Sequence, residues 1–159
     1  MILEVRQVLL RDLGALRAAL KAYPTEETIW SVPPGIANSA GTLALHVVGN
    51  LQYYIGAQLG GTGYQRDRTA EFSDRDVPLS VIEHRIEAAM RAVSDTLDRL
   101  SEPDSGHLYP IEIGGRTLSI RLFLTHLVSH TAYHLGQVDY HRRLISGVNR
   151  PAGPSIAGL

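Results

Sequence analysis

Apolar side chains recur at three- and four-residue steps along four segments of the chain, which is the spacing of one buried helical face. The segments run from Glu4 to Lys21, from an N-cap at Ser39 or Thr42 to about Leu59, from Ser80 to about Leu100, and from about Ser119 to Ile145. Four long antiparallel helices joined by shorter segments form an up-and-down bundle. The pattern therefore predicts an all-α protein with this architecture.

The third and fourth segments also predict which side chains face the core. For the third helix these are Val81, Ile82, Ile86, Met90, Val93 and Leu97, and for the fourth they are Leu122, Leu127, Val128, Leu135 and Val138. Ser80 followed by Glu83 is a capping-box pattern, so we expect the third helix to begin at Ser80.

The segments between the helices are rich in turn formers. A short helical turn is expected from Glu26 to Trp30, and Gly60-Gly61 should end the second helix. Residues 62–78 are polar and are expected to form a loop. The pair Gly114-Gly115 lies between short extended runs, which predicts a small hairpin before the last helix.

Length and composition limit the classes of function. With 159 residues, we expect residues 1–159 to form a single domain whose tail, 147–159, is irregular. Fifteen basic and sixteen acidic residues give a net charge of -1 without a basic stripe, which argues against nucleic acid as a partner. The charged N-terminal segment lacks the roughly 20 apolar residues of a membrane span, so we predict no membrane association and a cytoplasmic protein. Cysteine is absent, so any chemistry must come from histidines, carboxylates, hydroxyls or a bound cofactor.

The most distinctive pattern is a group of four histidines between positions 126 and 141. Side chains four positions apart in a helix lie one turn above each other, so His126, His130 and His134 share one face. Gln137 returns to nearly the same stripe. Two helical histidines can chelate a divalent metal, and a third ligand from another helix would complete the site.

His46, in the middle of the predicted second helix, is the candidate for that third ligand. With Asn50 and Tyr53 it forms a polar ridge on an otherwise apolar helix. Residue spacing alone leaves a plainer interpretation open, in which His46 is a hydrogen-bonded core residue and the other three are solvated side chains. The pattern is not the HExxH signature, because Thr131 follows His130 where a general-base Glu is required. We expect Asp139 to lie on another face and His141 to lie at the surface or rim.

Two motifs in these helices resemble those of the DinB-like superfamily of four-helix metal proteins. They are LHVVGN around His46 and HxxxHxxYHLGQ from His126 to Gln137, and the stretch from Asn50 to Phe72 is similar to an uncharacterised branch of that superfamily. The resemblance extends from the first helix to about Ser146. Carried over by position, it implies that His46, His130 and His134 are the metal ligands, and it leaves His126 as a residue of the pocket.

The resemblance implies metal-dependent chemistry on a small molecule. Members with an assigned activity are similar to thiol S-transferases and to a thiol-dependent maleylpyruvate isomerase, in which a divalent metal activates a low-molecular-weight thiol. Zn is the default for three imidazoles, and Ni, Fe or Mn suit the same donors. Transfer of a thiol, or less favourably of water, to an electrophilic small molecule is therefore the first hypothesis, and a non-catalytic metal-binding or stress-response protein is the second. The resemblance also implies a homodimer.

Further side chains are assigned around the expected metal site. Asn50, Tyr53 and Gln137 are candidates for the pocket or for hydrogen bonds to the ligating imidazoles. Arg66 and Arg68, with Glu71, could form an anion-binding rim, although an ordinary surface ion-pair cluster explains them equally well.

Overall fold

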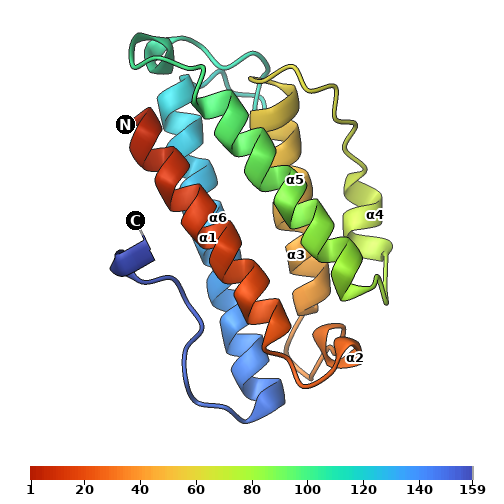
Figure 1. Cartoon of the computed structure of the whole chain (residues 1–159). Helices are drawn as coiled ribbons and strands as arrows, with labels where there is room; N and C mark the ends of the chain where they lie inside the picture. Colours follow the sequence, from red (N-terminus) through yellow and green to blue (C-terminus); the bar gives the residue numbers. More distant parts are fainter. Residues whose placement is uncertain (159) are drawn as a thin grey trace.

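A computed structural model of the chain describes residues 1–158 and shows a bundle of four long helices (Figure 1). These are α1 (Ile2–Lys21), α3 (Ala40–Leu51), α5 (Leu79–Leu97) and α6 (Ile120–Ser146), accompanied by two shorter helices, α2 (Glu26–Ile29) and α4 (Arg68–Ser73). Three non-α turns, η1 (Gln52–Ala57), η2 (Pro103–Gly106) and η3 (Ile156–Gly158), complete the helical elements. Residues 1–158 contain no β-strand, which confirms the prediction of an all-α bundle. None of the described helices is both long and apolar enough to span a membrane.

The apolar stripes of the long helices meet in one core. Leu9, Leu13 and Leu16 of α1 are buried there against Ile82 and Ile86 of α5 and the other long helices. Burying each such side chain contributes about 1.5–3 kcal/mol, so these stripes decide which face of each helix turns inward. Two predicted core residues are exceptions: Val81 is 39% exposed and Leu122 is 55% exposed. Each lies one position before the buried stripe, and one position turns a helical side chain by about 100°.

Side chains at the helix termini confirm some of the expected boundaries. The hydroxyl of Ser39 accepts a hydrogen bond from the backbone N–H of Thr42, and the hydroxyl of Ser119 accepts one from Leu122. The predicted capping box at Ser80 is wrong, because α5 begins at Leu79 directly after Pro78. Its first backbone N–H is instead satisfied by the carboxylate of Glu26, at 3.0 Å.

The order in which the helices alternate differs from simple up-and-down topology. Helix α1 runs antiparallel to α5, as the ion pairs Arg6–Asp98 and Lys21–Glu83 show. Helices α3 and α5, however, run in the same direction (Figure 1). Parallel neighbours require a long return connection, and residues 61–78 provide it by passing along the outside of the bundle.

This connection is not the structureless loop expected from its composition. It contains α4, whose first turn is capped by the carboxylate of Asp67, which accepts a hydrogen bond from the backbone N–H of Ala70 at 2.9 Å. The residues before it have no regular secondary structure and descend along the outside of the bundle, so that α4 lies beside α3 (Figure 1). The position of α4 matters because it brings a carboxylate to the candidate site.

The predicted hairpin before the last helix is present only as a turn with two isolated antiparallel bridges. Gly114 and Gly115 have φ values of 57° and 72°, which suit a two-residue turn of this kind. Beyond Gly147 the tail is irregular up to η3, and Leu159 lies outside the described residues. The tail is held to α6 where the backbone N–H of Ala152 donates to Asp139 at 2.9 Å.

Candidate metal centre

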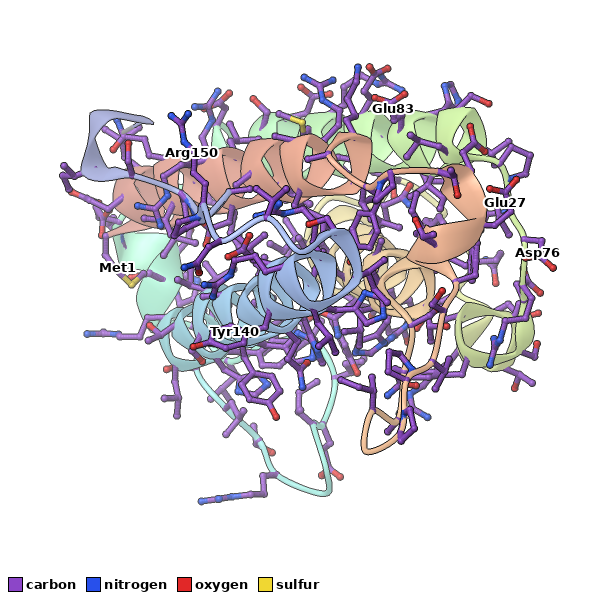
Figure 2. The ribbon with its side chains drawn as sticks, turned by 90° about the horizontal axis from the view of Figure 1, so that it is seen from below. Met1, Glu27, Asp76, Glu83, Tyr140 and Arg150 are labelled. Atoms are coloured by element: carbon purple, nitrogen blue, oxygen red, sulfur yellow. The ribbon has the colours of Figure 1, made fainter. Side chains whose placement is uncertain are left out.

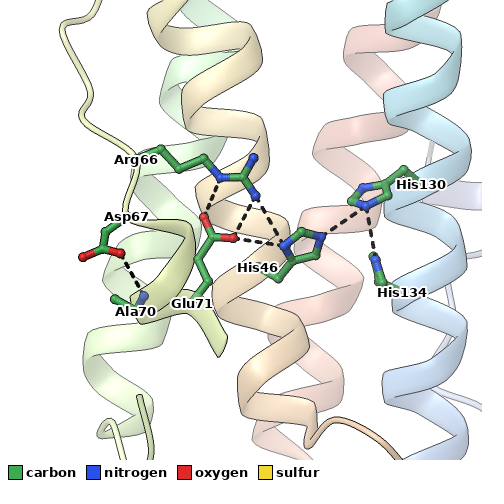
Figure 3. A network of polar contacts seen from close by, with 7 residues as sticks. All are labelled: His46, Arg66, Asp67, Ala70, Glu71, His130 and His134. Carbon is green, nitrogen blue, oxygen red and sulfur yellow. Dashed lines mark hydrogen bonds and ion pairs between the residues drawn. The ribbon is translucent and has the colours of Figure 1, made fainter. Parts of the chain in front are cut away.

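Three histidine side chains from two helices meet between α3 and α6 (Figure 3). The Nε2 atom of His130 lies 3.2 Å from Nε2 of His46 and 3.2 Å from Nε2 of His134. Candidate ligand atoms of all three residues lie within 4.8 Å of one another. His46 is buried and the other two are half-buried. The antiparallel packing of α3 on α6 thus joins residues that are 84 positions apart in the chain.

The spacing of these nitrogens fits a divalent metal ion. Two nitrogens bound tetrahedrally at about 2.0–2.1 Å from Zn²⁺ lie about 3.3 Å apart, close to the two distances of 3.2 Å observed here. The hydrogen bonds at the other ring nitrogens also favour metal binding. Nδ1 of His46 lies 3.0 Å from the carboxylate of Glu71, and Nδ1 of His134 lies 2.8 Å from Oε1 of Gln137. Both partners accept hydrogen bonds, which places the ring protons on Nδ1 and leaves lone pairs on the facing Nε2 atoms.

The protein surroundings keep two of these imidazoles neutral. Burial, together with the neighbouring histidines, lowers the pKa of His130 to about 4. Burial also lowers the pKa of His134, although its hydrogen bond with Gln137 opposes that effect. Neutral imidazole is the form that binds metal, so His130 and His134 are ready to act as ligands at neutral pH.

Glu71 of α4 is the carboxylate that orients His46. Arg66 holds it with two hydrogen bonds, from Nε to Oε1 at 2.6 Å and from Nη2 to Oε2 at 2.8 Å. Burial would raise the pKa of Glu71, but the hydrogen bonds from Arg66 and His46 hold it below the usual range for glutamate. Glu71 is therefore an ionised acceptor for the Nδ1–H group of His46. Arg66 Nη2 also lies 3.4 Å from this nitrogen, a longer contact than the 3.0 Å to the carboxylate.

This arrangement changes the interpretation of the two arginines expected at an anion-binding rim. The structure buries Arg66 against Glu71, so its guanidinium neutralises a carboxylate of the protein itself. Arg68 is exposed and lies over the ring of Phe72, with 5.0 Å between the guanidinium carbon and the ring centroid. The sequence pattern placed Glu71 beside these arginines but gave no sign of its contact with His46.

A glycine in α3 allows Glu71 to come close to this helix and to His46. A Cβ atom added to Gly49 would lie 2.8 Å from Cδ of Glu71 and nearer still to Oε1. Glycine in the interior of a helix costs about 1 kcal/mol relative to alanine, so its presence calls for a reason such as close packing. Gly49 follows His46 by three positions and faces the same neighbour. This glycine was the sequence signal that could have indicated a group packed beside His46.

The remaining predicted pocket residues lie on one side of the three histidines. His126 precedes His130 by one turn and stacks on Phe123, with 5.9 Å between the ring centroids. Asn50 follows His46 by one turn and is buried, and its Oδ1 atom has no hydrogen-bond partner among residues 1–158. Tyr53 lies in the π-helical turn η1 and is half-buried. Such turns occur frequently at functional sites because they redirect the side chains that follow.

His141 does not lie at the surface as expected. It is 3% exposed, its Nδ1 atom lies 2.7 Å from the hydroxyl of Tyr23, and its Nε2 donates to the backbone carbonyl of Ser31 at 2.9 Å. The segment that follows α1 covers this part of α6, since it supplies both Tyr23 and Ser31. As expected, Asp139 does not join the three histidines, and it pairs with Arg142 at 2.9 Å.

The fold and the site together define the class of protein: a helical bundle with three histidines contributed by two facing helices, as in the DinB-like superfamily that the motifs resemble. Comparison with protein families finds that the model for Mycothiol-S-transferase matches residues 4–147. The chain belongs to this family, which is part of the DinB-like superfamily of thiol S-transferases, so the resemblance is confirmed. A search of curated proteins finds no match.

Proposed function

We propose that this protein is a metal-dependent thiol S-transferase that joins mycothiol, the thiol in the family's name, to a small electrophilic molecule. The observation that carries the proposal is the convergence of His46, His130 and His134, whose candidate ligand atoms lie within 4.8 Å of one another. A divalent cation held there would favour the thiolate form of a bound thiol, because such an ion can deprotonate a coordinating thiol. Zinc is the metal we propose first, with nickel, iron and manganese as alternatives.

The residues of the chain keep the site ready for this reaction. Glu71 and Gln137 accept the Nδ1 protons of His46 and His134, and so fix the two rings with Nε2 toward the centre. Neutral histidines leave the charge of a bound divalent cation undiminished. We place Asn50, Tyr53 and His126 along the surface that receives the thiol, because they offer polar groups one to two turns from the ligands.

The chemical change that we propose is substitution at an electrophilic carbon. The thiol gives up its proton to solvent, the sulfur forms a bond to carbon, and the leaving group departs with its electron pair. The protein has no cysteine of its own, so the sulfur comes from the small-molecule thiol. Activation of water is less favoured, because Glu71 contacts His46 at Nδ1, on the opposite side of the ring from the Nε2 atom that faces His130.

The experiment starts from untagged protein, because a histidine tag would itself bind metal. We expect about one equivalent of divalent metal by elemental analysis, and metal-dependent conjugation of mycothiol to an aryl halide, with glutathione as a comparison thiol. His130→Ala should lose both metal and activity. His107→Ala, which removes an exposed histidine far from the site, should keep both.

Two outcomes separate the candidate functions. Stoichiometric metal without turnover on any thiol would support the second candidate, a non-catalytic metal-binding protein. Absence of metal from both the wild type and His130→Ala would refute the ligand assignment itself. The homodimer and the cytoplasmic location stay predictions, and sedimentation of the untagged protein at several concentrations would test the first.

A further inference from the structure

A pocket of about 450 Å³ lies beside the metal centre, between α6 and the loop that precedes α3. It is lined by the loop from Gly35 to Asn38, by Leu43 of α3, and by Gln137, Tyr140, His141 and Leu144 of α6. Figure 2 shows Tyr140 on the outer side of α6, the same side on which this orange loop projects. The volume lies in the range of about 300–1,000 Å³ that is typical of small-molecule sites.

The pocket begins one helical turn from the metal centre on both helices. Leu43 precedes His46 by three positions on α3, and Gln137 follows His134 by three positions on α6. Because the two helices are antiparallel, both steps lead to the same end of the site. Gln137 belongs to the pocket and to the centre at once, since its side-chain oxygen lies 2.8 Å from Nδ1 of His134.

Within the part of the chain that the structure describes, no lysine, arginine, aspartate or glutamate lines this pocket. The nearest cations are already engaged: Arg142 pairs with Asp139, and Arg143 lies over the ring of Tyr140 and within 3.3 Å of Asp139. Both ring nitrogens of His141 are also occupied, by Tyr23 and by the carbonyl of Ser31. An anionic ligand would therefore lose its hydration without gaining a cation in return.

The apolar side chains at the pocket suit an uncharged, apolar ligand. Leu43 forms part of the buried wall, whereas Leu144 is 61% exposed and would lose exposed apolar surface on contact with a ligand. The polar residues Asn50 and His126 lie on the other side of the three histidines, one turn after His46 and one turn before His130. The two sides of the centre thus differ in chemistry.

We propose that this pocket binds the uncharged aromatic or alkyl group of the electrophilic substrate, while the thiol approaches from the side of Asn50 and His126. The assignment of an electrophile rests on the proposed transferase function. The preference for an uncharged apolar ligand rests on the lining of the pocket alone, so the two can be tested separately.

Binding is tested with 1,3-dinitrobenzene, an uncharged aromatic molecule without a leaving group. Titration followed by amide chemical shifts should move resonances of residues 35–43 and 137–144, in metal-free and in zinc-loaded protein alike. Leu144→Glu, which places a carboxylate at the pocket mouth, should raise the dissociation constant about tenfold or more. Leu122→Glu is the matched control, because Leu122 has similar exposure on the same helix but lies near its other end. It should leave binding unchanged.

The matching kinetic test compares 1-chloro-2,4-dinitrobenzene with 4-chloro-3-nitrobenzoate, which adds a carboxylate. The neutral substrate should have the lower KM, and Leu144→Glu should raise that KM without changing the KM for mycothiol or the metal content. Shifts clustered elsewhere, or equal binding by the two leucine variants, would overturn the proposed pocket. Failure of every thiol to react would overturn the proposed function, while the titration of metal-free protein would still decide about the pocket.

Discussion

The substitution Gly49→Ala tests whether the close approach of α4 to α3 holds the metal centre together. The added Cβ atom would lie 2.8 Å from Cδ of Glu71 and 3.3 Å from its Cγ, so the carboxylate must move. That movement breaks at least one charge-assisted hydrogen bond, to Arg66 or to His46, at a cost of about 1.5–3 kcal/mol. Alanine offsets about 1 kcal/mol of this through its higher helix propensity. We expect a net loss of about 0.5–2 kcal/mol in the free energy of unfolding.

The larger effect should be on metal binding. Displacement of Glu71 removes the acceptor of the Nδ1–H group of His46, and loss of such a partner typically weakens metal affinity about 10–100-fold. Competition with a chromophoric chelator measures this affinity, and urea unfolding of the metal-free protein measures stability. Gly14→Ala in α1 is the matched control, because nothing lies within 4 Å of its added Cβ. It should gain about 1 kcal/mol at most and bind metal as the wild type does.

A double substitution separates the clash with Glu71 from other effects of the added methyl group. In the background of Glu71→Ala the clash at position 49 disappears, so Gly49→Ala should there cause no further loss of metal affinity. If Gly49→Ala alone keeps wild-type affinity and stabilises the protein as Gly14→Ala does, the glycine has no role in positioning Glu71. Our account of the site would then be refuted.

Three further predictions concern the same site and its supports. Glu71→Gln should weaken metal binding about 10–100-fold, because a neutral amide holds the Nδ1–H group of His46 less strongly. Substitution of the exposed Glu27 of α2 by Gln should not weaken it, and an unchanged affinity of Glu71→Gln in chelator competition would contradict this role. Tyr23→Phe should lower the free energy of unfolding by about 1–2 kcal/mol, because it leaves Nδ1 of the buried His141 without a hydrogen-bond partner. Urea unfolding measures this loss, and metal affinity should stay unchanged because the substitution does not touch the three histidines of the metal centre. Burial would raise the pKa of Asp139, but the N–H of Ala152 and the guanidinium of Arg142 hold that pKa below its usual value. The ionised carboxylate therefore contributes its full stabilisation above the unfolded-state pKa, and this stabilisation is lost as the pH falls through the lower folded-state pKa. Unfolding followed from pH 7 to below about pH 4 should therefore show a smaller acid-induced loss in Asp139→Asn than in the wild type, and equal losses would refute this role.

The position of α4 explains why a third segment of the chain belongs to the metal centre. In a bundle with strict up-and-down order, short connections would leave no segment free to lie against the middle of α3. Here α3 and α5 are parallel, so residues 61–78 must return along the bundle, and they carry Arg66 and Glu71 to His46. We infer that this connection serves the site as well as the topology.

Local sequence patterns predicted the four long helices, their approximate bounds and the stripe of histidines on the last one. Local rules suffice for these, because apolar periodicity, caps such as Ser39 and Ser119, and the four-residue spacing of His130 and His134 act within one or two helical turns. The family motifs then singled out His46 as the third ligand, and the structure places it 3.2 Å from His130.

The long-range neighbours of these residues depend on the packing of the folded chain. The packing of separate helices decides four features: the direction of α5, the contact of Glu71 with His46, the burial of His141, and the uncharged pocket lined in part by Gln137. Packing is set by the combined fit of many apolar surfaces, and no short stretch of sequence contains that information. Gly49 belongs to both groups. The sequence contains a glycine in the interior of a predicted helix, but the reason for it, the carboxylate of Glu71 packed against it, is found only in the folded protein.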